Sequence, residues 1–283
     1  MTDQTPLLYI FGLGYSGIAL AEQVMAAGWR VMGTVRSEAK VTELSAKGIE
    51  ASIWKGDATL SVPDGAHWLI TVPPDEEGCP VARNAAADVG AAASVTYLST
   101  TGVYGDREGG WVFEWSDVSP TSQRGHRRAK AERQWLAATG QTARLVRLPG
   151  IYGPGRSALD RLEGERARRI IKREQVFSRV HVQDIASGLL ALLQRPGLTG
   201  AFHLCDDAPA PPQDVIAFAA EVMGVPVPPD VDFETAGLSP MARSFYAECK
   251  RVSNGRTKGA LNWQPRYPTY REGLVALAAK SQT

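Results

Sequence analysis

A glycine-rich turn near the start of the chain, Gly12-Leu13-Gly14-Tyr15-Ser16-Gly17, is the segment whose spacing is best suited to bind a phosphate group. Gly12 permits a tight turn, Gly14 lets the backbone approach a pyrophosphate, and Gly17 lets a helix pack closely on the preceding strand. The helix N-terminus adds free N–H groups and partial positive charge. The sequence therefore predicts a dinucleotide site at this turn, against the alternative of a glycine turn without a ligand.

The elements that must position this turn alternate along the first half of the chain. Short apolar runs predict strands, and the segments between them predict helices. The predicted strands are Leu7–Phe11, Arg30–Val35, Ile49–Trp54, His67–Val72, Val95–Ser99 and Ala143–Leu148. The predicted helices are Gly17–Ala27, Ser37–Ala46, Pro80–Ala93 and Thr121–Ala138. This alternation is typical of an α/β fold with a Rossmann-type, doubly wound parallel sheet.

After Pro149 the alternation fails, and we expect a second, smaller region. Residues 1–150 are predicted to form the dinucleotide-binding domain, with residues 182–204 returning to it as a helix and a strand. Residues 151–181 and 205–283 are predicted to form a smaller substrate-binding region, with helices near Gln213–Met223 and Tyr270–Ala279.

Composition narrows the class of protein. The 283 residues carry 31 basic and 30 acidic side chains, which argues for neither nucleic acid nor membrane as a partner. The 3 cysteines lie far apart and match no zinc or redox spacing, so we expect free thiols, no metal and a cytoplasmic location. No apolar run approaches the length that spans a membrane.

Four further segments, read with the glycine turn, resemble the extended short-chain dehydrogenase/reductases, the superfamily that includes nucleotide-sugar epimerases and dehydratases. They are Tyr97–Asp106, Arg147–Gly155, Val180–Ala186 and Leu261–Trp263. The resemblance implies a cofactor site that includes Asp57 facing the adenine, and Val72, Pro73 and Pro74 beneath the ribose. Ser99 and Pro149, within the matching segments, complete the predicted cofactor site.

The end of the second predicted strand bears on which cofactor is bound. An NAD enzyme usually places a carboxylate there, on the ribose 2′-hydroxyl. This sequence has no acid in Thr34-Val35-Arg36-Ser37. Arg36 offers a planar cation suited to a 2′-phosphate, and Ser37 can add a hydrogen bond. We therefore predict NADP rather than NAD; in the alternative, Arg36 points into solvent.

The resemblance also implies a catalytic Ser or Thr, a Tyr, and a Lys four residues after that Tyr. Thr100 matches the first role. Aligning Gly125 and Glu132 with the family pattern places Arg124 where the Tyr stands and Arg128 where the Lys stands. A guanidinium stays protonated, so it can stabilise an oxyanion or an anionic group but cannot act as the ordinary acid or base. In the alternative, both arginines only pair with acids such as Glu132 or Glu114.

A second alignment places His126 and Lys130 at the Tyr and Lys positions, where His could transfer a proton. Helical periodicity puts Arg124 and Arg128 on the apolar side with Trp135, and His126 and Lys130 on a polar side. We therefore predict that Arg124 and Arg128 occupy the two positions and that the catalytic Tyr is missing.

Other groups could bear on the chemistry. Tyr104, Tyr152 and His181 are expected to pack in the interior, and Tyr15 either covers the cofactor or faces solvent. The basic segment Arg161–Arg173 either binds phosphate or carboxylate, through Arg166, Arg168, Arg169 and Lys172, or forms a salt-paired surface with Glu163, Glu165 and Glu174.

Taken together, the sequence predicts an NAD(P)-binding protein of the epimerase/dehydratase type. The expected activity is that of an NADP-dependent oxidoreductase or epimerase on a small polar, nucleotide-sugar-like substrate. The alternative is a dinucleotide-binding sensor or regulator without turnover, whose partner is a small-molecule effector. Family members often pair through two helices, which makes the helix carrying Arg124 a candidate surface for a homodimer.

Overall fold

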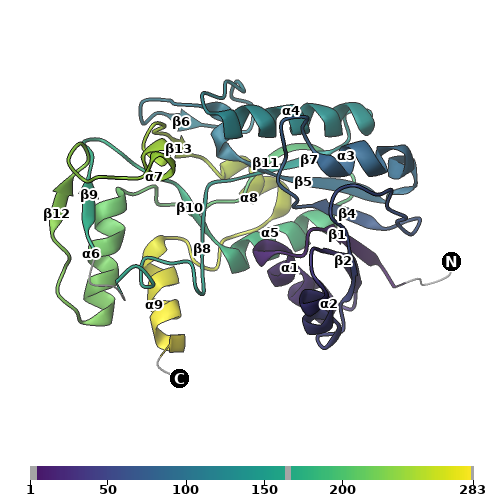
Figure 1. The fold of residues 1–283 in the computed structure, drawn as a ribbon, viewed down its shortest axis with the longest axis horizontal. Helices are drawn as coiled ribbons and strands as arrows, with labels where there is room; N and C mark the ends of the chain where they lie inside the picture. The colour runs from purple at the N-terminus through teal and green to yellow at the C-terminus, as the bar shows by residue number, and fades with distance from the viewer. Residues whose placement is uncertain (1–4, 163–166, 282–283) are drawn as a thin grey trace.

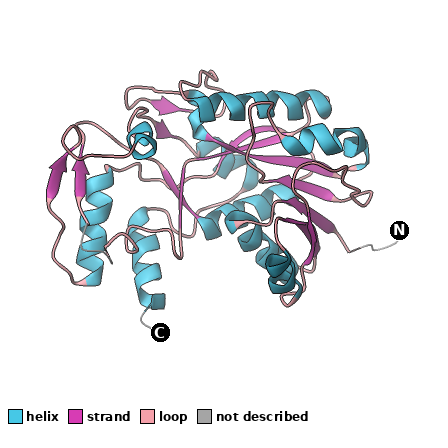
Figure 2. Ribbon diagram, viewed as in Figure 1, coloured by secondary structure: helices cyan, strands magenta, loops and turns pink. Residues whose placement is uncertain are grey.

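A computed structural model describes residues 5–162 and 167–281. Its centre is a seven-stranded parallel sheet with the strand order β11-β7-β5-β4-β1-β2-β3, drawn in Figure 1 and coloured by element type in Figure 2. The strands are β1 (Leu7–Phe11), β2 (Arg30–Val35), β3 (Glu50–Ile53), β4 (His67–Ile70), β5 (Ser94–Thr100), β7 (Arg144–Leu148) and β11 (Gly200–His203). This is the doubly wound Rossmann-type α/β fold that the alternation predicts.

Helices cover both faces of the sheet (Figure 1). One face packs against α1 (Tyr15–Ala26), α2 (Glu38–Ser45) and α5 (Val182–Leu193), through an apolar cluster that includes Ile10, Leu20 and Leu189. The other face packs against α3 (Pro80–Ala85) and α4 (Gln123–Ala138), where Trp68 and Trp135 are buried edge to face. Both faces being apolar explains why the central strands read as continuous hydrophobic runs.

The predicted helix Pro80–Ala93 is shorter than expected. It ends as an α-helix at Ala85 and continues as the 3₁₀ segment η1 (Ala86–Ala91). Asp88, Val89 and Gly90 all have low helix propensity, which accounts for the early end of the α-helix.

The C-terminal region consists of smaller elements beside the sheet, at the left of Figure 1. Three short parallel pairs join β8 (Gly150–Tyr152) to β10 (Arg179–His181), β9 (Arg169–Ile171) to β12 (Asp230–Asp232), and β6 (Trp111–Val112) to β13 (Arg251–Val252). The helices are α6 (Pro212–Met223), α7 (Pro240–Phe245), α8 (Gly255–Leu261) and α9 (Tyr270–Ser281). Sequence periodicity did not indicate the short strands, because each takes only two or three residues and pairs with a distant segment.

Asp184 fastens this region to the sheet. Its buried carboxylate accepts hydrogen bonds from the backbone N–H groups of Arg266, at 2.6 Å, and Tyr267, at 3.1 Å. Burial raises the pKa of Asp184 to about 6, although both N–H groups favour its charged form. One side chain at the start of α5 thus holds the chain just before α9.

Across the described ranges 5–162 and 167–281, none of the helices combines the length and apolar character needed to cross a bilayer. The same ranges contain no group of three or more His, Cys, Asp or Glu side chains arranged to hold a metal ion. Cys79, Cys205 and Cys249 are free thiols.

Candidate functional site

Residues that follow the central strands meet at one edge of the sheet, because parallel strands all end there. We call this the carboxyl edge. It brings together most of the predicted site residues: the glycine turn after β1, Arg36 and Ser37 after β2, Asp57 in the loop after β3, Val72–Pro74 after β4, Ser99 and Thr100 at the end of β5, and Pro149 after β7.

The glycine turn is fixed between β1 and β2. Gly12 has φ +93°, in the left-handed region, and a Cβ there would lie 2.8 Å from Thr71 Oγ1. The Gly12 N–H donates to Thr34 Oγ1 at 3.0 Å, and the Leu13 N–H donates to the Thr34 carbonyl at 2.8 Å. These contacts hold the turn in one conformation before α1 begins.

Gly14 and Gly17 have different surroundings. A Cβ on Gly17 would meet Ile10 at 3.2 Å and the Gly12 carbonyl at 3.3 Å, so this glycine sets the approach of α1 to β1. A Cβ on Gly14 would meet only the Gly12 carbonyl, at 4.0 Å. Gly14 is the N-cap of α1 and supplies no side-chain cap, so no capping side chain satisfies the first-turn N–H groups. This arrangement fits the pyrophosphate of a dinucleotide.

Arg36 and Ser37 are both exposed at the end of β2. Within the described part of the chain, Arg36 forms neither an ion pair nor a hydrogen bond, and the Ser37 side chain makes no capping bond to α2. Asp57 is exposed as well, and Val72, Pro73 and Pro74 are partly to fully accessible. The side chains at this end of the carboxyl edge are therefore free to contact a ligand.

Tyr15 connects the glycine turn to a loop far along the chain. Its hydroxyl donates to the Pro154 carbonyl at 3.1 Å, and the Arg156 guanidinium lies 4.7 Å from the centre of its ring. Gly153 is required at this contact, because a Cβ there would lie 2.4 Å from the Tyr15 hydroxyl. The loop thus brings Arg156, a cation that the sequence analysis missed, beside the glycine turn. The run of glycines and proline marked an irregular loop but not what it contacts.

Thr100 and Ser99 end β5 with two hydroxyl groups. Thr100 Oγ1 accepts the Gly102 N–H at 3.1 Å and caps the 3₁₀ segment η2 (Thr101–Tyr104), so its own proton is free to be donated. Ser99 is 5% exposed, and its hydroxyl has no hydrogen-bond partner among the described residues. Buried hydroxyls are rarely left unpaired, which makes this position notable at a site edge.

Arg124 and Arg128, the two arginines of α4 at the predicted catalytic positions, lie differently. Arg128 donates to the Leu98 carbonyl at 2.6 Å and to the Tyr97 hydroxyl at 3.1 Å, so it turns inward to β5. Arg124 is exposed, and its guanidinium lies 5.2 Å from the centre of the Phe245 ring, at the end of α7. In the described residues neither arginine pairs with an acid.

Glu132 and Glu114, the acids considered as their partners, belong instead to a buried polar network. Glu132 forms a two-bond ion pair with Arg147, at 2.8 and 3.0 Å. Arg147 also donates to the Tyr104 hydroxyl at 2.7 Å, and that oxygen lies 2.6 Å from His203 Nε2. Glu114 accepts from the hydroxyl of Thr257, at 2.9 Å.

The geometry assigns the protons in this network. His203 Nδ1 lies 2.7 Å from the Ser253 carbonyl, which can only accept, so Nδ1 carries the proton. Burial lowers the pKa of His203, so Nε2 is the free acceptor, and Tyr104 donates to it while accepting from Arg147. Tyr104 is the last residue of η2, and Thr100 caps the other end of that segment. The network therefore fixes the position of η2.

Tyr104, Tyr152 and His181, which could otherwise act as proton donors, are buried. Burial raises the pKa of Tyr104 to about 12, raises that of Tyr152 further, and lowers that of His181 to about 4. The Tyr152 hydroxyl points to the Thr269 carbonyl, and His181 Nδ1 accepts the Gln183 N–H at 3.2 Å. These groups hold the fold, and none is suited to exchange protons near pH 7.

The basic segment after Arg161 is partly paired. Arg169 pairs with Asp230 at 2.6 Å, and Lys172 donates to the Tyr246 carbonyl. Arg161 and Arg168 are exposed, have no partner among the described residues, and line a cavity of about 360 Å³ together with Tyr246. Glu163, Glu165 and Arg166, which the sequence analysis also considered, lie outside the described residues.

Solved structures of other proteins are similar to this chain. A conserved protein of unknown function from Silicibacter pomeroyi DSS is 46% identical, with a TM-score of 0.91 over 99% of this chain and 100% of that one. A protein from Methylobacillus flagellatus assigned as an NAD-dependent epimerase/dehydratase is 26% identical, with a TM-score of 0.75 over 99% of both chains. No protein-family model matches the sequence.

Among curated proteins, a 3-diazoavenalumate denitrifying reductase from a Streptomyces species is 30% identical over 161 residues. The match spans 52% of this chain and only about half of that reductase, 51%. More distant structures share the fold alone, among them a dTDP-glucose 4,6-dehydratase and a UDP-glucuronic acid 4-epimerase solved with NAD, which are 14% and 15% identical. Several structural neighbours of this chain are thus epimerases or dehydratases, two of them solved with NAD, and they share its Rossmann-type fold.

Proposed function

We propose that the chain is an NADP-dependent reductase of a small polar substrate that carries an anionic group. The observation that carries the proposal is the carboxyl edge. The glycine turn lies there beside Arg36, a cation that has no partner among the described residues and stands at the position where a carboxylate would select NAD.

In this proposal the glycine turn binds the cofactor pyrophosphate, and Arg36 and Ser37 bind the 2′-phosphate. Arg156 adds positive charge on the other side of Tyr15. The bound nicotinamide would supply the hydride. Side chains at the end of β5 and on α4 would contact the reacting group of the substrate.

Reduction suits these side chains better than alcohol oxidation. Oxidation requires a base that takes the hydroxyl proton, and an arginine in place of the Tyr cannot do so. Reduction of a carbonyl requires stabilisation of the oxygen as negative charge develops. The free proton of Thr100 and the exposed guanidinium of Arg124 can provide it, and solvent can then supply the proton. The word reductase in the name of the Streptomyces relative agrees with this direction.

The anionic substrate group is inferred from the cavity of about 360 Å³ in the C-terminal region. Its volume suits a small ligand, and Arg161 and Arg168, which have no partner among the described residues, give it two cations beside Asp160, whose carboxylate accepts from the Ser157 hydroxyl. Arg124 contacts Phe245, and the next residue, Tyr246, lines the cavity. We therefore place the reacting carbon near Thr100 and the anionic group toward Arg161.

The test is NADPH oxidation by purified protein with aldehydes and ketones, each offered with and without a carboxylate or phosphate group. The account predicts turnover of anionic members of the panel. Thr100→Val should lower kcat by about 10²–10³-fold while NADPH affinity is kept, since one donor to a developing oxyanion is lost. The matched control Thr142→Val removes an exposed hydroxyl just before β7, at the opposite edge of the sheet, and should change neither value.

Two results would contradict the proposal. If no member of the panel is reduced although NADPH binds, the reductase proposal is wrong, and a dinucleotide-binding sensor without turnover explains the site. Turnover that Thr100→Val leaves unchanged would contradict the role given to that hydroxyl.

A further inference from the structure

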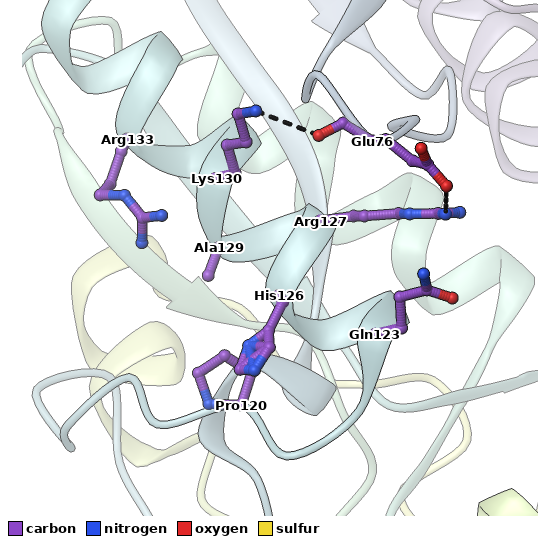
Figure 3. Close-up of a pocket in the computed structure, with 8 residues that line it drawn as sticks. All are labelled: Glu76, Pro120, Gln123, His126, Arg127, Ala129, Lys130 and Arg133. Atoms are coloured by element: carbon purple, nitrogen blue, oxygen red, sulfur yellow. Dashed lines mark hydrogen bonds and ion pairs between the residues drawn. The ribbon is translucent and has the colours of Figure 1, made fainter.

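A second cavity lies between α4 and the loop after β4 that carries Glu76 (Figure 3). Its volume is about 510 Å³. The residues that line it are Glu76, Pro120, Gln123, His126, Arg127, Ala129, Lys130 and Arg133. None of them belongs to the predicted cofactor site, and His126 and Lys130 are the pair set aside as catalytic residues in favour of Arg124 and Arg128, so this basic groove needs its own explanation.

Positive charge in the basic groove is only partly balanced. Glu76 is the one acid among its lining residues, and its carboxylate pairs with Arg127 at 2.7 Å. Lys130 donates to the backbone carbonyl of Glu76 at 3.0 Å, which brings no negative charge to it. Figure 3 shows both contacts, with Arg133 apart from them. Over residues 5–162 and 167–281, the exposed side chains of His126 and Arg133 contact no acid.

This charge pattern is unfavourable for the helix alone. Arg127, Lys130 and Arg133 follow one another at spacings of three residues on α4, and like charges at such spacings destabilise a helix by a few tenths of a kcal/mol per pair. A bound anion would remove that repulsion. Pairing of this face with the same face of a second copy would double it, which argues against a symmetric contact centred on the groove.

We propose that the basic groove binds a small molecule carrying two or more phosphate or carboxylate groups. Arg133 offers a planar fork for two oxygens, and His126 and Lys130 offer donors on the same helical face. The volume lies within the range of small-molecule sites. The groove thus provides a second anion site, separate from the proposed cofactor site and independent of the proposed reaction.

The experiment is calorimetric titration of the full-length protein with inorganic pyrophosphate. We expect binding that weakens at least tenfold in the double variant His126→Ala/Arg133→Ala, whose two side chains are exposed and support no packing. Arg36→Ala removes a cation at the proposed cofactor site, and Arg168→Ala removes one at the proposed substrate cavity. Neither control should abolish this binding component.

A second readout locates the ligand. Of the 4 histidines, His126 is the only one classed as exposed, so its ring signals in NMR spectra can be followed by comparison with His126→Ala. These signals should move and saturate at the pyrophosphate concentration that calorimetry gives. The proposal is overturned if they do not move, or if Arg36→Ala abolishes all binding while the double variant keeps it. It is equally overturned if sedimentation shows a dimer that the double variant dissociates, because the groove would then be a contact between copies.

Discussion

The carboxyl edge and the buried polar network differ in how their polar groups are satisfied. At the edge, Arg36 is exposed and has no partner among the described residues, and no side chain caps the first-turn N–H groups of α1. In the network, Arg147, Tyr104 and His203 contact one another and are almost inaccessible to solvent. The two regions lie at the same end of the strands, so position alone does not separate them.

This difference assigns different tasks to chemically similar side chains. An arginine whose donors are all used within the protein stabilises the fold, whereas an arginine left unpaired at an open edge is available to a ligand. Arg147 and Arg36 represent the two cases. Substitutions at paired groups should therefore cost free energy of unfolding, and substitutions at unpaired groups should cost binding.

The largest effect is expected from Arg147→Met. The substitution leaves the Glu132 carboxylate buried without its counter-charge, which should lower the free energy of unfolding by about 3–5 kcal/mol. Urea denaturation measures it. In the control Arg30→Met, the lost pair with Glu50 is more than half exposed on both sides, 57% and 56%, so a change within about 1 kcal/mol is expected. Equal losses in the two variants would contradict the distinction.

Gly14→Val should lower the affinity for NADPH and leave the free energy of unfolding almost unchanged. Gly14 has φ −98°, which any residue adopts, and its Cβ position is nearly free of contacts, so the fold should tolerate the change. The added side chain would occupy the path of the pyrophosphate, and we expect NADPH affinity to fall about 100-fold, or about 2.7 kcal/mol. Gly197→Val, also in open space, is the control for adding the same side chain elsewhere. A loss of stability without a loss of affinity would reverse the assignment.

Asp206 tests, through pH, what burial costs a carboxylate that is only partly paired. It is 2% exposed, one carboxylate oxygen has no hydrogen-bond partner among the described residues, and burial raises its pKa from 3.8 to about 7. The folded protein therefore keeps a proton that the unfolded chain loses near pH 4. This contribution to stability is fully present below about pH 4 and is lost as the pH rises through about 7.

Asp206→Asn should therefore be more stable than the wild type at about pH 8, by about 1–3 kcal/mol, with little difference near pH 4. Thermal or urea unfolding at several pH values measures this. Asp64→Asn, at an exposed carboxylate, should leave the pH profile unchanged. A variant less stable than the wild type at pH 8 would show that the charged form of Asp206 is the one that the fold uses.

The sequence predicted the carboxyl edge more completely than the network. The glycine turn, Arg36 and Thr100 are local signals, because each depends on a few neighbouring residues and on the ends of strands with clear patterns. The partner of Glu132 was not predictable in this way. Helical periodicity indicated which side of α4 it faces, but the choice of Arg147 over Arg124 or Arg128 depends on how α4 packs on the sheet.

The C-terminal region was the least predictable for a related reason. The short strands β8, β9 and β10 have no period of their own and form only by pairing with partners distant in the chain. Arg156 reaches the glycine turn through a contact between Tyr15 and a loop 139 residues away. Such contacts are set by tertiary packing, which the sequence pattern does not encode locally.

The central claim is that the unpaired Arg36 selects NADP, and titration with NADPH and NADH tests it most directly. Quenching of the 7 tryptophans reports binding to the wild type and to Arg36→Ala. The account predicts that the wild type binds NADPH at least about tenfold more tightly than NADH, since a charge-assisted contact contributes about 1.5–3 kcal/mol. Arg36→Ala should erase that preference and leave NADH affinity unchanged. Equal affinities for the two cofactors in the wild type, or a preference that survives in Arg36→Ala, would contradict it.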